Sequence, residues 1–159
     1  MTKRKKGWLI GGIIFAVVAI GFAVEAIIVL NMSRNHFRLD ASDYGPSEEI
    51  AIDDKDYAVM IYEKRSFVVF VDQAGCLKTG NMSEWLKDFP EEMQFKYYNL
   101  RWPFAKKTSL YDYVKYTPSI VLINKGEVVA WLKADSDEDE KYYNDPEALK
   151  EWLETYIIF

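Results

Sequence analysis

The longest apolar run of the chain covers residues 8–30, between a basic tip at residues 1–7 and a polar stretch at residues 31–49. As a helix rising about 1.5 Å per residue, it spans roughly 34 Å, enough to cross a hydrocarbon core of about 30 Å. The run is longer than the apolar part of a cleavable signal peptide and lacks a convincing small-x-small cleavage site. Because basic residues stay in the cytoplasm, the pattern predicts an uncleaved single-pass anchor with an extracytoplasmic C-terminal domain. Glu25 interrupts the run near its outer end, where its carboxyl group either reaches the interface, is neutral, or contacts a partner helix.

From about residue 50 the pattern changes to alternating helices and strands. The run at residues 66–71 is continuously apolar, with β-branched and aromatic side chains, as is typical of a strand buried on both faces. Four apolar residues between positions 82 and 89 recur at i, i+3, i+4 and i+7, which predicts an amphipathic helix. The predicted elements are a helix at 56–65, a strand at 66–71, a helix at 82–89, a strand at 94–100, a short helix at 109–116, a hairpin at 118–134 and a helix at 145–159.

This order of elements predicts the fold class. Strands separated by helices become parallel neighbours through right-handed crossovers, whereas the two strands of the hairpin pair antiparallel. We therefore expect an α/β domain of three layers at residues 50–159, with a central mixed sheet and helices on both faces. Residues 31–49 are expected to be a linker between this domain and the transmembrane helix at residues 8–30.

Composition and charge narrow the classes of function and of partner that we expect. The chain has 159 residues, of which half are apolar, and a formal net charge of −5. No basic cluster follows residue 31, so a nucleic-acid partner is not expected. A single cysteine and a single histidine, His36 in the predicted linker, provide no metal-ligand spacing, and we expect neither a metal nor a cofactor. The acidic run at residues 135–140 lacks the glycine and spacing of a calcium loop and is expected to be a solvated turn.

Two segments resemble the thioredoxin-like superfamily. "FVVFVDQAGC" places Cys76 after a buried strand and at the start of the next helix, and "YTPSIVLINKGEVV" places Thr117 and Pro118 directly before the hairpin. The resemblance covers roughly residues 50–159. It implies a thioredoxin-like fold, a cis peptide bond at Pro118, and an active site that brings Cys76 and Thr79 close to Thr117 and Pro118.

The active-site motif departs from the family pattern. The family's C-x-x-C motif is "CLKT" here, with Thr79 in place of the second cysteine, and Gly75 replaces the aromatic residue usual before the first. A chain with one cysteine cannot cycle between a dithiol and an intramolecular disulfide. Cys76 could still act as a monothiol nucleophile, since a helix N-terminus and Lys78 would favour its thiolate, or it is a remnant on a binding scaffold. The nearby Asp72 resembles the family's proton-transfer acid, but we expect it to cap the strand end or to lie in solvent.

Arg101, Trp102 and Phe104 follow the second predicted strand and are candidate recognition residues, because arginine and aromatic side chains are favoured at interfaces. The resulting expectation is a non-dithiol binding or accessory module in a bacterial cell membrane, which serves exported or envelope proteins. The alternative is thiol-disulfide exchange by Cys76 on extracytoplasmic substrates.

Overall fold

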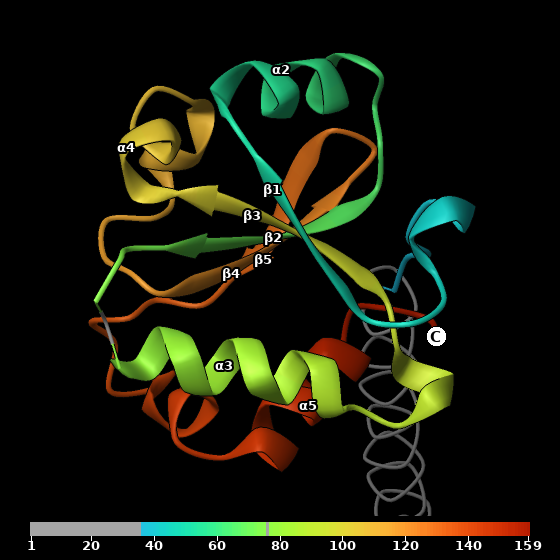
Figure 1. Ribbon diagram of the computed structural model, residues 1–159, viewed down its shortest axis with the longest axis vertical. Helices are drawn as coiled ribbons and strands as arrows, with labels where there is room; N and C mark the ends of the chain where they lie inside the picture. The colour runs from blue at the N-terminus through green and yellow to red at the C-terminus, as the bar shows by residue number, and fades with distance from the viewer. Residues whose placement is uncertain (1–35, 76) are drawn as a thin grey trace, which may run out of the picture. The chain divides into compact units, whose positions relative to one another are not determined.

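A five-stranded mixed sheet with the order β1-β3-β2-β4-β5 organises the domain (Figure 1). The computed structural model describes residues 36–75 and 77–159. The strands are β1 (Glu48–Ile52), β2 (Phe67–Asp72), β3 (Lys96–Arg101), β4 (Ser119–Asn124) and β5 (Glu127–Trp131). The helices are α2 (Asp54–Tyr62), α3 (Leu77–Asp88), α4 (Trp102–Ala105) and α5 (Pro146–Glu154), with 3-10 turns η1 (Ala41–Asp43), η2 (Glu91–Met93), η3 (Ser109–Asp112) and η4 (Glu140–Tyr143).

Helices cover both faces of this sheet, as the sequence predicts. Figure 1 shows α2 and α4 on one side and α3 and α5 on the other. Strand β2 lies in the middle, parallel to β3 and antiparallel to β4, and all six of its residues are buried. Successive side chains of a strand point to opposite faces, so β2 supplies both apolar cores. The α/β three-layer fold is confirmed.

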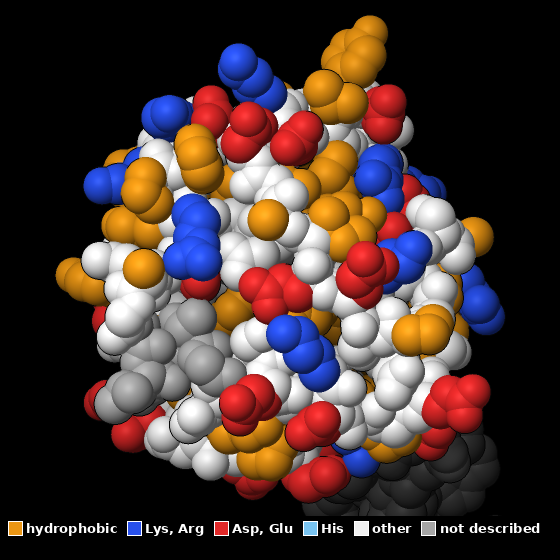
Figure 2. All heavy atoms as spheres, in the orientation of Figure 1, with side chains coloured by type: hydrophobic (Ala, Val, Ile, Leu, Met, Phe, Trp, Pro, Cys, Tyr) orange, Lys and Arg blue, Asp and Glu red, His pale blue; other side chains and the backbone are white. Residues whose placement is uncertain are grey.

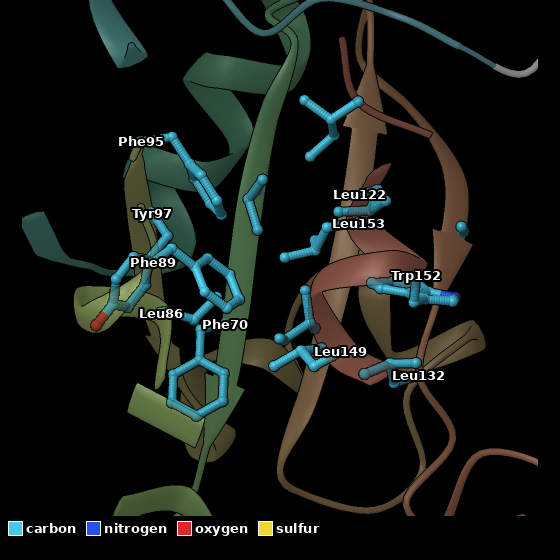
Figure 3. Packing of buried hydrophobic residues seen from close by; sticks show 14 of the residues in the cluster. Phe70, Leu86, Phe89, Phe95, Tyr97, Leu122, Leu132, Leu149, Trp152 and Leu153 are labelled. Carbon is cyan, nitrogen blue, oxygen red and sulfur yellow. The ribbon is translucent and has the colours of Figure 1, made fainter. Parts of the chain in front are cut away.

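The core on the α3 and α5 side is built around Phe70 of β2, which is fully buried. Figure 3 shows Phe70 and Leu86 on one side of this core, with Leu149 and Leu153 of α5 facing them. Phe70 and Tyr97 meet edge to face with ring centroids 6.3 Å apart. Burying an aromatic ring in such a cluster contributes roughly 2–3 kcal/mol relative to exposure, so this core holds α3 and α5 against the sheet.

Capping residues fix where the long helices begin. Asp53 accepts hydrogen bonds from the backbone of Lys55 and Asp56, while the Asp56 side chain accepts one from the backbone N–H of Asp53. This reciprocal pair satisfies amide groups that an α-helix leaves without partners at its first turn. At α5, Asp145 caps the helix and Pro146 takes its first position, which confirms the predicted start.

The hairpin between β4 and β5 turns at Lys125 and Gly126, as predicted from "NKG". Both residues have positive φ, 52° and 80°, as a two-residue hairpin turn of the mirror-image type requires. A Cβ on Gly126 would lie 2.7 Å from the carbonyl oxygen of Ile61, and the Gly126 N–H donates to the carbonyl of Arg65 at 2.9 Å. Only glycine allows the hairpin tip to approach the end of α2 this closely.

The compact unit begins at Phe37, before the predicted boundary at residue 50. Phe37 and Leu39 are buried, and Phe37 exchanges backbone hydrogen bonds with residues 156–158 near the end of the chain. The Tyr44 hydroxyl donates to the carbonyl of Ile158 at 2.6 Å. The predicted linker is therefore part of the domain from residue 37 on, because a few isolated apolar side chains in a polar segment reach the core.

Some elements differ from the expectation. Strand β1 and helix α4 were not predicted, and of the helix expected at 109–116 only residues 109–112 form a helical turn, the 3-10 turn η3. Among residues 36–75 and 77–159, no helix has the length and apolar character needed to cross a membrane. The predicted anchor at residues 8–30, including Glu25, lies outside the described residues.

Candidate functional site

The carboxyl ends of β2 and β3 meet the start of β4 at one edge of the sheet. Asp72 and Arg101, the last residues of β2 and β3, lie opposite each other in the parallel register. Because β4 runs antiparallel to β2, its first residue Ser119 lies opposite Val71. This register brings Pro118 beside the end of β2, where the sequence predicts the active-site loop.

The Thr117–Pro118 peptide bond is cis, as the resemblance implied. Pro118 is buried and Thr117 is half-buried. The hydroxyl of buried Ser119 donates to the carbonyl of Leu132 at 2.6 Å, and the Leu132 N–H donates to the carbonyl of Ile120 at 2.9 Å. These bonds hold the chain after β5 against the cis-proline loop.

A groove of about 180 Å³ lies between the segment before Pro118 and the segment after β5. Its lining residues are Tyr113, Val114, Lys115, Tyr116, Leu132, Lys133, Ala134 and Asp135. Tyr116 is 58% exposed at this groove. Apolar walls with two lysines and one aspartate can bury apolar side chains of a ligand and pair with its charges.

Asp72 is only 4% exposed, which corrects the expectation of a solvated or capping residue. Its Oδ1 atom lies 3.4 Å from Nε of Arg101 but accepts no hydrogen bond from the described residues. Burial raises the pKa of the Asp72 carboxyl above its usual value, although Arg101 and Asn99 favour the charged form. A buried carboxyl group whose Oδ1 atom makes no hydrogen bond can accept a proton or a hydrogen bond there.

A polar network under α3 accompanies Asp72. Glu49 of β1 accepts hydrogen bonds from Nδ2 of Asn99 at 2.6 Å and from the hydroxyl of Ser83 at 2.9 Å. Burial of Glu49 favours its neutral form, but the bonds from Ser83 and Asn99, with a further one from Lys87, outweigh burial and lower the pKa of Glu49. The Oδ1 atom of Asn99 is buried and accepts no hydrogen bond from the described chain. Sequence reasoning missed Glu49 and Asn99; the signal was an asparagine inside the otherwise apolar and aromatic run "YYNL".

The fold agrees with that of solved thioredoxins. A thioredoxin pre-protein from Schistosoma mansoni superposes with a TM-score of 0.51 at 15% identity, covering 69% of this chain and 99% of that chain. A mutant thioredoxin from Halobacterium salinarum gives a TM-score of 0.52 at 15% identity, covering 72% of this chain and 96% of that chain. The chain has a thioredoxin-like fold. Neither a protein-family model nor a curated protein sequence matches it.

In this thioredoxin-like fold, the candidate recognition residues lie at the end of β3 and in α4. Arg101 is the last residue of β3, its side chain is 53% exposed, and it faces Asp72. Trp102 and Phe104 belong to α4, are half-buried, and pack against the core on the α2 and α4 side. Trp102 also contacts Tyr111, with ring centroids 5.9 Å apart. Arg101 thus lies at the site, whereas much of the two aromatic side chains is committed to packing.

The structure describes only part of the cysteine motif. Cys76 is outside the described residues, as are the side chains of Lys78 and Thr79, and α3 begins at Leu77, directly after Cys76. Gly75 is exposed and has a φ of 83°. The predicted proximity of Cys76 and Thr79 to the cis-proline loop therefore stays a prediction.

The remaining candidates show no chemical role. His36 is exposed. In the acidic run, Asp139 accepts a hydrogen bond from the backbone of Lys133 at 2.8 Å and so closes the turn that precedes α5. Within the described part of the chain, no cluster of three histidine, cysteine or acidic residues could hold a metal ion.

Proposed function

We propose that this chain is a thioredoxin-fold binding module that works without dithiol chemistry and holds a polypeptide segment of its partner beside Pro118. The groove next to the cis-proline loop carries this proposal, together with the absence of a second cysteine from the sequence. The loop geometry of the fold is present, but the thiol pair that would make it an oxidoreductase is missing.

The walls of the groove favour a segment with apolar side chains. Tyr113 and Tyr116 line one wall and Leu132 the other, so an extended segment could bury side chains between them. Lys133 and Asp135 lie at the same groove and could pair with charged residues of the segment. Aromatic residues in partly exposed grooves commonly dominate binding energy, so the tyrosines are the expected anchors.

The N-terminal sequence supports a proposal for where in the cell the domain works. We propose that residues 8–30 cross a bacterial cell membrane with the tip at residues 1–7 in the cytoplasm, and that the domain works outside it. In that position the partner would be an exported or membrane protein, and the chain would be an accessory component in its export or assembly.

A second candidate function is monothiol exchange by Cys76. The start of α3 at Leu77 favours it, because a thiol directly before a helix is stabilised as thiolate. The thiolate would attack a disulfide of the substrate, forming a mixed disulfide and releasing one substrate thiolate, which takes up a proton. A low-molecular-weight thiol would then attack the mixed disulfide, releasing Cys76 as a thiolate and remaining bound to the substrate.

Photo-crosslinking of the full-length chain in its native membrane tests both functions. A photoreactive phenylalanine analogue replaces Tyr116 in the groove or, as a control, Glu147 of α5, whose side chain is 73% exposed. The binding proposal expects a discrete adduct from position 116 only, with its yield unchanged by Cys76→Ser. Adducts of equal yield from both positions would contradict groove binding. A mixed-disulfide adduct that thiol reagents reduce, and that Cys76→Ser abolishes, would support exchange.

A further inference from the structure

We propose a second docking site, along the free edge of β1, for an extended segment of a partner polypeptide that carries apolar side chains flanked by lysine or arginine. Strand β1 pairs only with β3 among the described strands. No backbone hydrogen bond joins residues 48–52 to any other described segment on the outer side. An extended segment could therefore join the sheet as a sixth strand, through main-chain hydrogen bonds.

A groove lined by apolar and charged side chains runs beside this edge. It has a volume of about 380 Å³ and lies between β1 and α2. Its lining residues are Ile50, Ala51, Ile52, Asp56, Val59, Met60, Glu63 and Arg65. An added strand would point every second side chain toward this groove, so backbone pairing and side-chain burial would act together.

Helix α2 leaves two large apolar side chains exposed, and one of them, Val59, lines the groove. Val59 is 54% exposed and Tyr62 is 88% exposed. Figure 2 shows hydrophobic side chains together with acidic ones at the top of the molecule, over α2 and β1. Large exposed apolar side chains among polar ones are a feature of interaction sites.

The charge of β1 and α2 determines which kind of partner segment the groove favours. Residues 48–63 contain six acidic side chains and one basic side chain, Lys55, but Glu49 faces α3 and pairs with Lys87, and Asp54 pairs with Lys107. Asp56 and Glu63 line the groove and form no ion pair with described residues. The one cation of the groove, Arg65, is already bound by Asp40 and Asp43 at 2.8 and 3.0 Å. A basic segment is therefore favoured, whereas pairing of two β1 edges from two copies would bring acidic strips together.

The opposite edge of the sheet, β5, is less regular. Strand β5 pairs with β4 through a register shift between Leu122 and Ile123, an irregularity that twists a strand and disfavours edge pairing. Strand β1 pairs with β3 in unbroken register from Glu48 to Ile52. The unbroken register distinguishes β1 as the docking edge, and β5, which also has a groove beside it at Val129, Ala130 and Trp131, provides a control.

The test uses the full-length chain in detergent micelles and a synthetic peptide of alternating valine and threonine with a lysine at each end. Binding is measured by fluorescence anisotropy, and hydrogen exchange is measured at the amides of residues 50–52. We expect saturable binding and slower exchange at those of these amides that point away from β3. A peptide with N-methylated backbone nitrogens should not bind, because it cannot pair with the strand, and one with glutamates at its ends should bind more weakly.

Two exposed valines provide matched variants. Val59→Lys replaces a groove wall with a positive charge and should weaken binding by about tenfold or more, given the apolar burial that is lost. Val129→Lys, on β5, where valine is 40% exposed, should leave binding unchanged. Equal binding of the N-methylated peptide, an equal loss with Val129→Lys, or no binding would each overturn the proposal. A chain dimer that excess peptide does not dissociate would assign the edge to a second copy instead. Cross-linking from position 116 is independent of all these outcomes.

Discussion

Two buried aspartates lie near opposite ends of β2 and differ in how their carboxyl groups are satisfied. Asp43, 1% exposed, accepts hydrogen bonds from Nη2 of Arg65 at 3.0 Å and from the hydroxyl of Tyr98 at 2.8 Å. Asp72, 4% exposed, has Arg101 at 3.4 Å and an oxygen without a hydrogen bond from the described chain. The first carboxylate has hydrogen bonds from two buried or partly buried side chains, whereas one oxygen of the second is buried without a hydrogen bond, which is costly.

The difference separates a structural charge from a candidate functional one. Arg65 also binds Asp40, so one guanidinium ties the segment before β1 to the chain before β2. Asp72 ties nothing comparable together, and it lies beside the cis-proline loop at Pro118. Four substitutions test this contrast.

The largest effect is expected for Asp43→Ala. The substitution leaves Arg65 and the Tyr98 hydroxyl without their shared acceptor, and breaking a buried ion pair from one side costs about 3 kcal/mol. Urea unfolding of the full-length chain, followed by tryptophan fluorescence, measures the loss. Asp40→Ala, at a side chain that is 34% exposed, is the control and should lose about 1 kcal/mol. Equal losses at the two positions would show that burial of Asp43 has no special role.

Asp72→Asn should stabilise the folded chain at neutral pH, whereas Asp43→Ala destabilises it. Because burial raises the pKa of Asp72, the folded chain binds its proton more tightly than the unfolded chain does. The wild type should therefore lose stability relative to Asp72→Asn as pH rises from the ordinary value of 3.8 through the higher folded pKa. At pH 7 the variant should be more stable by about 1 kcal/mol, since it buries no charge. A variant that is less stable at pH 7 would show that Asp72 is a structural anion like Asp43.

For Glu49 the pH dependence should have the opposite sign: the wild type should gain stability relative to Glu49→Gln as pH rises. The pKa of Glu49 is lowered in the folded chain, so its ionised form contributes stability above the ordinary value of 4.5. That contribution should disappear as pH falls through the lowered pKa, and the wild type and variant should then converge. Because the Glu49 side chain is 30% exposed, the difference at pH 7 should stay below about 1 kcal/mol. Stability curves from pH 3 to 7 measure it, and a difference that widens toward acid would contradict the assignment.

The smallest effect is expected for Arg101→Gln. Removing the cation that favours ionised Asp72 should raise the pKa of that carboxyl further, with a stability change of only a few tenths of a kcal/mol, about the value of an exposed pair. Carboxyl carbon NMR titration of Asp72 measures the shift. Lys107→Gln, at an exposed pair with Asp54, is the control and should leave the Asp72 titration unchanged. A pKa that stays constant or falls in Arg101→Gln would mean that the two groups do not interact.

The sequence predicted what depends on local pattern. Residues 66–71 form a buried strand because a continuous apolar run has few other solutions, and "NKG" forms the hairpin turn because its geometry needs glycine. The cis bond at Pro118 followed from the resemblance. Strand β1 was not predicted because its sequence, "EEIAI", is short, half-exposed and acidic. The burial of Asp72 depends on how the helices pack against the sheet and on Arg101, which is distant in the sequence. The residues around position 72 therefore do not predict it.

The contact between Phe37 and the end of the chain has a mechanical consequence. A force that enters the domain at His36 meets the backbone bonds to Tyr156 and Ile158 first. These residues follow α5, whose Leu149, Trp152 and Leu153 are buried in the core. Tension from the N-terminal side is thus carried by the C-terminal helix, and the two ends of the domain should yield together when it is pulled apart.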